Sequence, residues 1–155
     1  MAPQLRRTYA SPVGPLLATL DEGGALVELG RARIELVGRA PAHPTFSLLD
    51  EELGRYWAGE AVQFTVPVNP PGTPFQHKVW AALRTLPWGR TLTYGELAAR
   101  VGSNARAVGQ ANGANPVAIV IPCHRVVGRD GSLVGYAGGL DMKRELLRIE
   151  RCLLL

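Results

Sequence analysis

The sequence predicts a protein of the α/β class in its α+β form, with a small antiparallel sheet followed by a mainly helical region. Three observations predict it: a glycine turn between two strand-like stretches, several stretches with apolar residues at helical spacing, and a proline- and glycine-rich break at residues 69–74. The chain has 155 residues, 46% of them hydrophobic and 19% charged, which is typical of a globular protein. We expect two domains, residues 1–69 and residues 70–155.

The first region contains the signals of a hairpin, a helix and a further strand. Residues 9–20 and 25–29 flank the sequence Asp-Glu-Gly-Gly at 21–24, which predicts a hairpin with a glycine turn, and residues 63–68 are strand-like. No residue group here suggests chemistry, so we expect a structural α+β domain. A helix is predicted between hairpin and strand, because five residues recur on one helical face: Phe46, Leu49, Leu53, Tyr56 and Trp57.

The second region opens with a helix whose apolar stripe ends before Pro87. Thr93 and Glu96 then form a capping box, which predicts the start of a second helix, and Gly102 suits its C-terminal turn. Ser103 or Asn104 caps a third helix. Two short helices joined by a tight glycine-containing turn predict a helix-turn-helix. The last amphipathic helix follows later, with an apolar stripe of Met142, Leu146, Ile149 and Leu153.

The second helix of this motif is expected to run to about residue 112, where Gly113 stops it, and it is unusually smooth. Alanine or glycine occupies every second position, and polar residues that read bases in the major groove are nearly absent. Arg106 is its one basic residue. These features favour a helix that docks in a minor groove and contacts the backbone without strong sequence preference.

The strongest chemical signal is Pro-Cys-His-Arg-Val-Val-Gly at 122–128, which follows the apolar run 117–121. A β-branched run bounded by proline predicts a buried active-site strand that ends at Cys123. A thiolate is a nucleophile, and an adjacent His124 or Arg125 favours it. These residues alone leave open an inert core cysteine. Neighbouring strand residues point to opposite faces, so His124 reaches Cys123 only if the chain turns or a water bridges them.

Charge and cysteine content bear on the binding partner and on the cellular compartment. Residues 1–69 carry six arginines and eight acids, whereas residues 70–155 carry eleven lysines and arginines and five acids. The basic half therefore bears Cys123, which suits a polyanionic partner or simply a solvated surface. Two cysteines do not form a disulfide framework, and no apolar run has membrane length. We expect a cytoplasmic protein with no membrane association.

Four motifs in order resemble the O6-alkylguanine-DNA alkyltransferase family. They are Thr93–Ala98, Arg106–Gly109, Asn115–Gly128 and Gly135–Gly139, and the resemblance is dense between residues 72 and 150. It implies direct-reversal DNA repair: the alkyl group of O6-alkylguanine, and also of O4-alkylthymine, passes irreversibly to Cys123 after the base is flipped from the duplex. The partner would be double-stranded DNA carrying O6-alkylguanine, and the protein would act once, as a monomer.

The resemblance also assigns roles to residues. Cys123 would be the nucleophile, His124 would take its proton through a water, and Glu150 would hold the imidazole. Tyr94 would donate to N3 of the leaving base, and Asn115 would fix the turn around the thiol. The substrate pocket would contain Tyr136, Ala137, Gly138, Ala118 and Val126. DNA contacts would come from Arg106, which fills the gap left by the flipped nucleotide, and from Ala107, Gly109, Gln110, Ser103, Asn104, Thr93, Tyr94 and Arg125.

Departures and alternatives remain at this point. The turn between Gly102 and Arg106 is shorter than is usual in the family, which affects its expected phosphate contacts. No metal or cofactor is expected, because the three histidines are dispersed and no glycine fingerprint for a nucleotide is present. Three other functions are a non-catalytic lesion-binding protein, which would lack Cys123, a helix-turn-helix regulator, which would need base-reading residues, and a cysteine hydrolase, which would need an acyl-type substrate and an oxyanion site.

Overall fold

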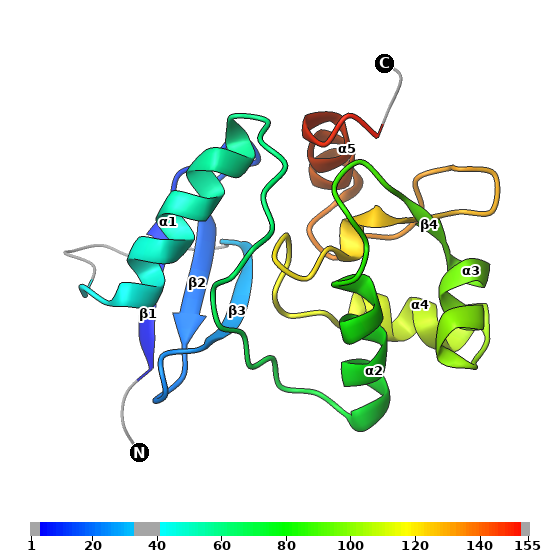
Figure 1. Cartoon of the computed structure of the whole chain (residues 1–155), viewed down its shortest axis with the longest axis horizontal. Helices are drawn as coiled ribbons and strands as arrows, with labels where there is room; N and C mark the ends of the chain where they lie inside the picture. Colours follow the sequence, from blue (N-terminus) through cyan, green and yellow to red (C-terminus); the bar gives the residue numbers. More distant parts are fainter. Residues whose placement is uncertain (1–3, 33–40, 153–155) are drawn as a thin grey trace.

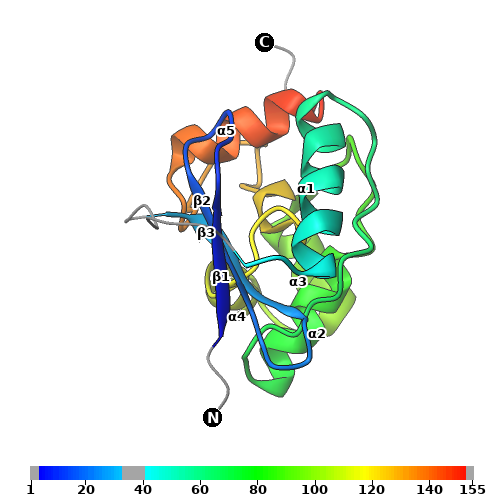
Figure 2. The ribbon, with the colours of Figure 1, turned by 90° about the vertical axis from the view of Figure 1, so that its left-hand side faces the viewer.

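A computed structural model describes residues 4–32 and 41–152 (Figure 1). Its N-terminal part is an antiparallel sheet in the order β1-β2-β3, formed by β1 (Leu5–Tyr9), β2 (Leu16–Leu20) and β3 (Leu26–Arg31). Helix α1 (Pro44–Trp57) covers one face of this sheet, which Figure 2 shows nearly edge-on. The apolar face predicted for this helix is buried, with Phe46 and Leu49 in the core.

The hairpin prediction is confirmed, with two changes to the strands around it. Gly24 closes the turn with a φ of +83°, and its amide donates to the carbonyl of Asp21 over 3.0 Å. Residues 9–20 are not one strand, because a second turn at 11–14 separates β1 from β2. Residues 63–68 form no strand either: they bend at Val66 and make one bridge, between Val68 and Leu26.

The C-terminal part is mainly helical, as predicted. Two short parallel strands, β4 and β5, lie at its centre and pair Leu92 with Val126. The elements in chain order are α2 (Pro74–Leu83), β4 (Leu92–Thr93), α3 (Tyr94–Val101), α4 (Ala105–Gly113), the 3-10 turn η1 (Cys123–Arg125), β5 (Val126–Val127) and α5 (Leu140–Ile149). Leu153, expected on the last helix, lies outside the described residues.

Helices α3 and α4 form the predicted helix-turn-helix. Both hydrogen bonds of the capping box are present at Thr93 and Glu96, and Gly102 has the left-handed conformation, with a φ of +69°. Asn104, rather than Ser103, caps α4, and its side-chain oxygen accepts from the amide of Ala107 over 2.9 Å. The short turn therefore closes with standard caps at both ends.

The apolar run before the cysteine is buried but is not a strand. Residues 118–121 form turns, and Ile119 has a φ of +72°. Prolines at both ends of the run, Pro116 and Pro122, have no amide proton to donate to a sheet. Only Val117 makes a bridge, to Leu29 at the edge of β3. The α+β class is thus confirmed, whereas the predicted active-site strand is replaced by turns and the 3-10 turn η1.

The two parts of the molecule join along the edge of β3. The Leu29 amide donates to the carbonyl of Pro116, and the Ala118 amide donates to the carbonyl of Leu29. These bonds cover an edge that would otherwise expose unpaired backbone groups. The division near residue 69 stays a prediction. Within the described residues, no helix is both long and apolar enough to cross a membrane.

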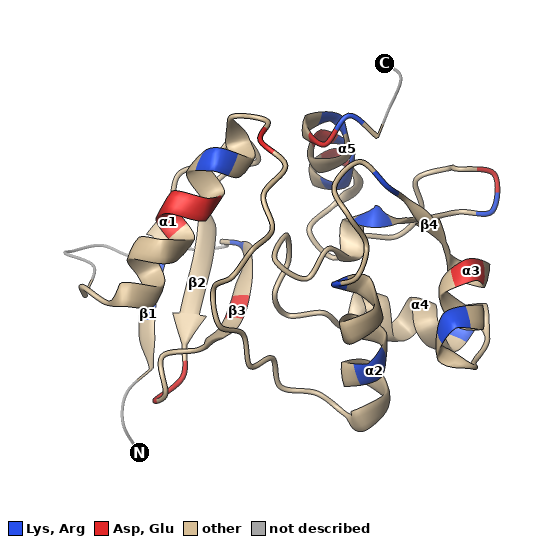
Figure 3. Ribbon diagram, viewed as in Figure 1, with Lys and Arg blue, Asp and Glu red and all other residues tan. Residues whose placement is uncertain are grey.

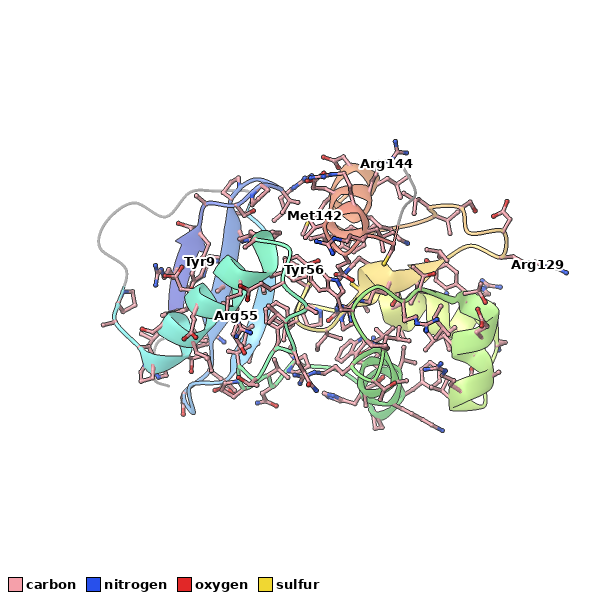
Figure 4. The ribbon with its side chains drawn as sticks, turned by 45° about the horizontal axis from the view of Figure 1, so that its top comes forward. Tyr9, Arg55, Tyr56, Arg129, Met142 and Arg144 are labelled. Atoms are coloured by element: carbon pink, nitrogen blue, oxygen red, sulfur yellow. The ribbon has the colours of Figure 1, made fainter. Side chains whose placement is uncertain are left out.

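Charged residues are distributed unevenly over the ribbon. Figure 3 shows lysines and arginines on α2, α3 and α5 of the C-terminal part, acidic residues on α3 and α5 as well, and both signs of charge on α1. In Figure 4 the side chains of Arg129 and Arg144 extend away from the body of the protein. The basic half expected from the sequence therefore has positive side chains at its surface, as a polyanion-binding protein requires.

Candidate active site

A cavity of about 690 Å³ lies where the edge of the N-terminal sheet, α4 and the loop before α5 meet. Cys123 lines this cavity and has only 6% of its surface exposed. Seven other residues expected from the sequence line it as well: Tyr94, Gly109, Asn115, Ala118, Tyr136, Ala137 and Gly138. The structure thus brings most of the predicted pocket together.

The turn that carries Cys123 is held by two amide side chains. Asn115 donates to the carbonyls of Ile121 (2.8 Å) and Val117 (3.3 Å), and its oxygen accepts from the Val117 amide (3.0 Å). Asn112, which the sequence reasoning did not single out, donates to the carbonyl of Cys123 over 3.2 Å. These bonds replace the sheet hydrogen bonds that the turn lacks, and they fix the position of the thiol.

The surroundings of Cys123 favour the neutral thiol. Burial raises the pKa of Cys123, and this effect outweighs interactions with Asn115, Lys143 and Tyr136 that favour the thiolate. The sequence-based expectation that adjacent charges lower the pKa of Cys123 is therefore wrong. A buried thiol needs a base to become a nucleophile.

A buried ion-pair network involves the two residues that follow the cysteine in the chain. Nε2 of His124 is 2.5 Å from Oε2 of Glu150, and Nε of Arg125 is 2.6 Å from Oε1 of the same carboxylate. His124 and Glu150 are both fully buried. Burial alone would raise the pKa of Glu150, but the charges and hydrogen bonds of His124 and Arg125 outweigh it and lower that pKa to about 2. Glu150 is therefore an anion over the physiological range.

The second nitrogen of the imidazole is available for chemistry. Nδ1 of His124 is buried and has no hydrogen-bond partner within residues 4–32 and 41–152. Because Glu150 occupies Nε2, Nδ1 is the only ring nitrogen able to accept a proton. The 3-10 turn provides the change of chain direction that a strand would not have allowed.

Two residues do not lie where their predicted roles require. The Arg125 guanidinium is buried, because it pairs with Glu150 and donates to the carbonyl of Leu86 over 2.7 Å. The residue is 6% exposed and its Nε and Nη1 are occupied within the protein, so the expected DNA contact does not fit the structure. Val126 is fully buried in β5 and does not line the cavity, so it does not fit a pocket role either.

The loop over the cavity is fixed by two basic residues that the sequence reasoning missed. Nζ of Lys143 donates to the carbonyls of Val134 (2.9 Å) and Gly135 (3.3 Å). Arg31 of β3 donates to the carbonyl of Gly138 over 2.9 Å and pairs with Asp141 over 3.1 Å. A signal for Lys143 was present, since it lies seven residues before Glu150 on the same helical face.

A second, shallower groove continues from the cavity along α4. It is lined by Ala105, Arg106, Gly109 and Gln110 on the helix and by Val134 and Gly135 opposite, and Tyr94 and Gly109 line both hollows. Arg106 is exposed at this groove. The hydroxyl of Tyr94 donates to the carbonyl of Val134 over 3.1 Å. Burial raises the pKa of Tyr94, so the hydroxyl keeps its proton.

The other predicted DNA contacts lie at one end of this groove or near it. Asn104 and Gln110 are exposed, and Ser103 and Ala107 are half-buried. Thr93 is half-buried and its hydroxyl is occupied by the amide of Glu96, so it acts first as a helix cap. The surface of α4 is thus open, small and uncharged except for Arg106.

Comparison with known proteins identifies close relatives. The family described as 6-O-methylguanine DNA methyltransferase, DNA binding domain, matches residues 74–152. The chain is 45% identical over 152 residues to the methylated-DNA–protein-cysteine methyltransferase of Mycobacterium bovis, covering 94% of this chain and 91% of that protein. The Salmonella typhimurium protein of the same name is 46% identical, with 97% and 98% covered.

Solved structures agree with this result. The Mycobacterium tuberculosis O6-methylguanine methyltransferase superposes with a TM-score of 0.84 at 42% identity, covering 96% of this chain and 93% of that one. A structure of the M. tuberculosis protein in complex with DNA superposes with a TM-score of 0.83 at 43% identity, covering 94% and 92%.

Proposed function

This chain belongs to the 6-O-methylguanine DNA methyltransferase family, and we propose that it removes alkyl groups from O6-alkylguanine in double-stranded DNA by transferring them to its own Cys123. One observation carries this proposal. A buried thiol lines a cavity large enough for a base, and a histidine whose carboxylate partner is fully ionised lies next to it in the sequence. O4-alkylthymine is proposed as a second substrate.

The transfer is a single displacement. The thiolate sulfur of Cys123 forms a bond to the alkyl carbon while the bond from that carbon to O6 breaks, and guanine leaves with the electron pair. The thiol proton passes to Nδ1 of His124, by way of a bridging water. Glu150 stabilises the resulting imidazolium through Nε2 and stays ionised itself, because its own pKa is about 2.

The leaving base needs a proton to depart as neutral guanine. Tyr94 lines both the cavity and the α4 groove, and its hydroxyl is protonated, so it is suited to donate at N3 of the base once substrate replaces the Val134 carbonyl as its partner. The proton held by His124 then passes to the Tyr94 phenolate. The balance is one thiol and one alkylated guanine converted to one thioether and one guanine, so each molecule acts once.

Access to the base requires that it leave the stack. The target oxygen lies inside a duplex, and flipping the nucleotide costs a few kcal/mol. We propose that the protein binds DNA as a monomer, with α4 in the minor groove. The flipped base enters the cavity past Tyr94 and Gly109, and Arg106 fills the gap that the base leaves in the stack.

The direct test is the mass of the intact protein after mixing with a duplex that carries one O6-methylguanine. We expect the mass to rise by one methyl group per protein molecule, with the methyl on Cys123, and the DNA to contain unmodified guanine. A protein that binds this duplex without gaining mass would be a lesion-binding protein, and the proposed transfer would be wrong.

Ala118 provides a prediction on alkyl size. Some family members carry proline here, and Ala118 leaves more room in the cavity but less contact for a bulky group. We expect benzyl transfer to be faster in Ala118→Pro, with a smaller effect on methyl transfer, measured as single-turnover rates with the two alkylated guanines in DNA. The change also removes the hydrogen bond from the Ala118 amide to Leu29, which costs roughly 1 kcal/mol of stability.

Ala118→Val is the matched control for that experiment. Valine adds apolar surface to the cavity but keeps the amide proton, so it separates contact with the alkyl group from the lost hydrogen bond. Both variants should raise the ratio of benzyl to methyl transfer. Equal changes for the two alkyl groups in both variants would show that residue 118 does not contact the alkyl group.

A further inference from the structure

The carboxylate of Glu150 has a third partner, and it comes from the N-terminal sheet-and-helix part of the protein. The hydroxyl of Tyr56, on α1, donates to Oε2 of Glu150 over 2.5 Å. The same oxygen accepts from Nε2 of His124, while Arg125 takes Oε1. Tyr56 is 94 residues away in the sequence, and the residues around it were expected to be purely structural.

The tyrosine ring is tightly held, so the direction of its hydroxyl is fixed. It packs edge-on against Trp57 and Trp88, with ring centroids 5.1 Å and 5.3 Å away, and lies tilted against Phe64 at 5.8 Å. Tyr56 is fully buried. Burial, and then the charge of Glu150, raise the pKa of Tyr56 far above its ordinary value, so the hydroxyl is always a donor to the carboxylate.

The hydroxyl has a specific effect on the carboxylate. The last torsion of a glutamate is broad, so one ion pair with Arg125 does not define where Oε2 points. Two donors on Oε2, one from α1 and one from the imidazole, do define it. A fixed Oε2 in turn restricts the plane of the His124 ring, and with it the direction of the unpartnered Nδ1.

We propose that Tyr56 is a positioning residue for alkyl transfer, which holds Glu150 so that His124 receives the Cys123 proton in the correct ring orientation. This inference rests on the proposed function and extends it to the N-terminal part of the chain. Tyr56 touches neither substrate nor thiol; it acts through Glu150.

The test compares Tyr56→Phe with Tyr9→Phe. Tyr9 is a second buried tyrosine of the N-terminal part, and its hydroxyl donates to the Phe46 carbonyl over 3.1 Å, so its variant loses one buried hydrogen bond away from Glu150. Figure 4 labels both residues, with Tyr9 on the sheet and Tyr56 on the side of α1 nearer the C-terminal part. The substrate is free O6-benzylguanine, because it needs no DNA binding, and the readout is the rate at which Cys123 gains the benzyl group.

We expect Tyr56→Phe to react about 10-fold more slowly than wild type. This loss is smaller than the full rate contribution of a general base, because His124 itself is still present. Tyr9→Phe should react at the wild-type rate. Binding of alkylated duplex should be unchanged in both variants. Melting curves are recorded first, and rates are compared at a temperature at which all three proteins are folded.

A spectroscopic signature separates positioning from a general loss of structure. In protein labelled with 15N-histidine, the ring-nitrogen signals of His124 should shift in Tyr56→Phe and stay in place in Tyr9→Phe. Should Tyr56→Phe not fold, protein containing 3-fluorotyrosine at its four tyrosines keeps their shape and changes the acidity of the hydroxyls, and the His124 signals must then shift.

Three results would overturn the inference: a wild-type rate in Tyr56→Phe, an equal slowing in Tyr9→Phe, or unmoved His124 signals. Failure of the proposed function looks different. In that case the wild-type protein itself would gain no benzyl group on Cys123.

Discussion

The Cys123→Ala variant will gain no alkyl group from duplex DNA that carries O6-methylguanine, while it binds that duplex nearly as well as wild type. The thiolate is the acceptor in the proposed reaction, whereas the affinity comes from phosphate contacts and from the cavity, which the substitution leaves in place. The loss of transfer should be complete, because no other group can take the role of the sulfur. Intact mass and a binding titration at fixed salt concentration measure the two quantities.

Cys152 provides the control, because it is the second cysteine of the chain. Burial raises the pKa of Cys152 to about 11, so it is a neutral thiol, and it does not line the cavity. Cys152→Ala should therefore transfer the methyl group at the wild-type rate. A methyl group found on Cys152 in the Cys123→Ala variant would contradict the assignment of Cys123 as the acceptor.

Local signals in the sequence predicted the helix-turn-helix well, because each signal and its partner are close together. Thr93 caps an amide three residues on, and Gly102 needs only its own freedom to adopt a positive φ. The same holds for α1 and α5, where one apolar face decides the helix. Interactions of this kind can be predicted from a few consecutive residues.

The errors arose where a local composition pattern competed with prolines, side-chain hydrogen bonds or distant partners. The run before Cys123 has the composition of a strand, but the prolines at its ends and the side-chain bonds of Asn115 hold it in turns. Arg125 looks like a DNA contact until the fold brings Glu150 against it from 25 residues away. Burial likewise reverses the pKa direction expected for Cys123.

Tyr56 illustrates the limit most clearly. In the sequence it is one of five residues on a helical face, and phenylalanine would satisfy that pattern equally well. Its hydroxyl has a role only in the folded protein, where Glu150 at the end of α5 lies next to α1 and accepts its hydrogen bond. A tyrosine at a core position was a signal that a polar partner exists, but no signal in the chain named that partner.

Arg106→Ala should slow the repair of alkylated duplex by roughly 10- to 100-fold, a share of the few kcal/mol that flipping a nucleotide costs. If Arg106 fills the gap in the stack, its contribution exists only when a duplex is opened. Alkylation of Cys123 by free O6-benzylguanine should therefore proceed at the wild-type rate, since a free base needs no extrusion. Single-turnover rates with duplex, single-stranded DNA and free base measure this.

Arg100→Ala is the matched control, because Arg100 is another exposed arginine of the helix-turn-helix, in the last turn of α3. Both variants lose one positive charge, and removing an arginine that only contacts a phosphate reduces the salt slope of binding by about one. Only Arg106→Ala should distinguish duplex from single-stranded DNA, where no gap in a stack has to be filled. Equal slowing on both substrates would make Arg106 a phosphate contact. Unchanged repair of both would mean that the short turn capped by Asn104 holds Arg106 away from the DNA.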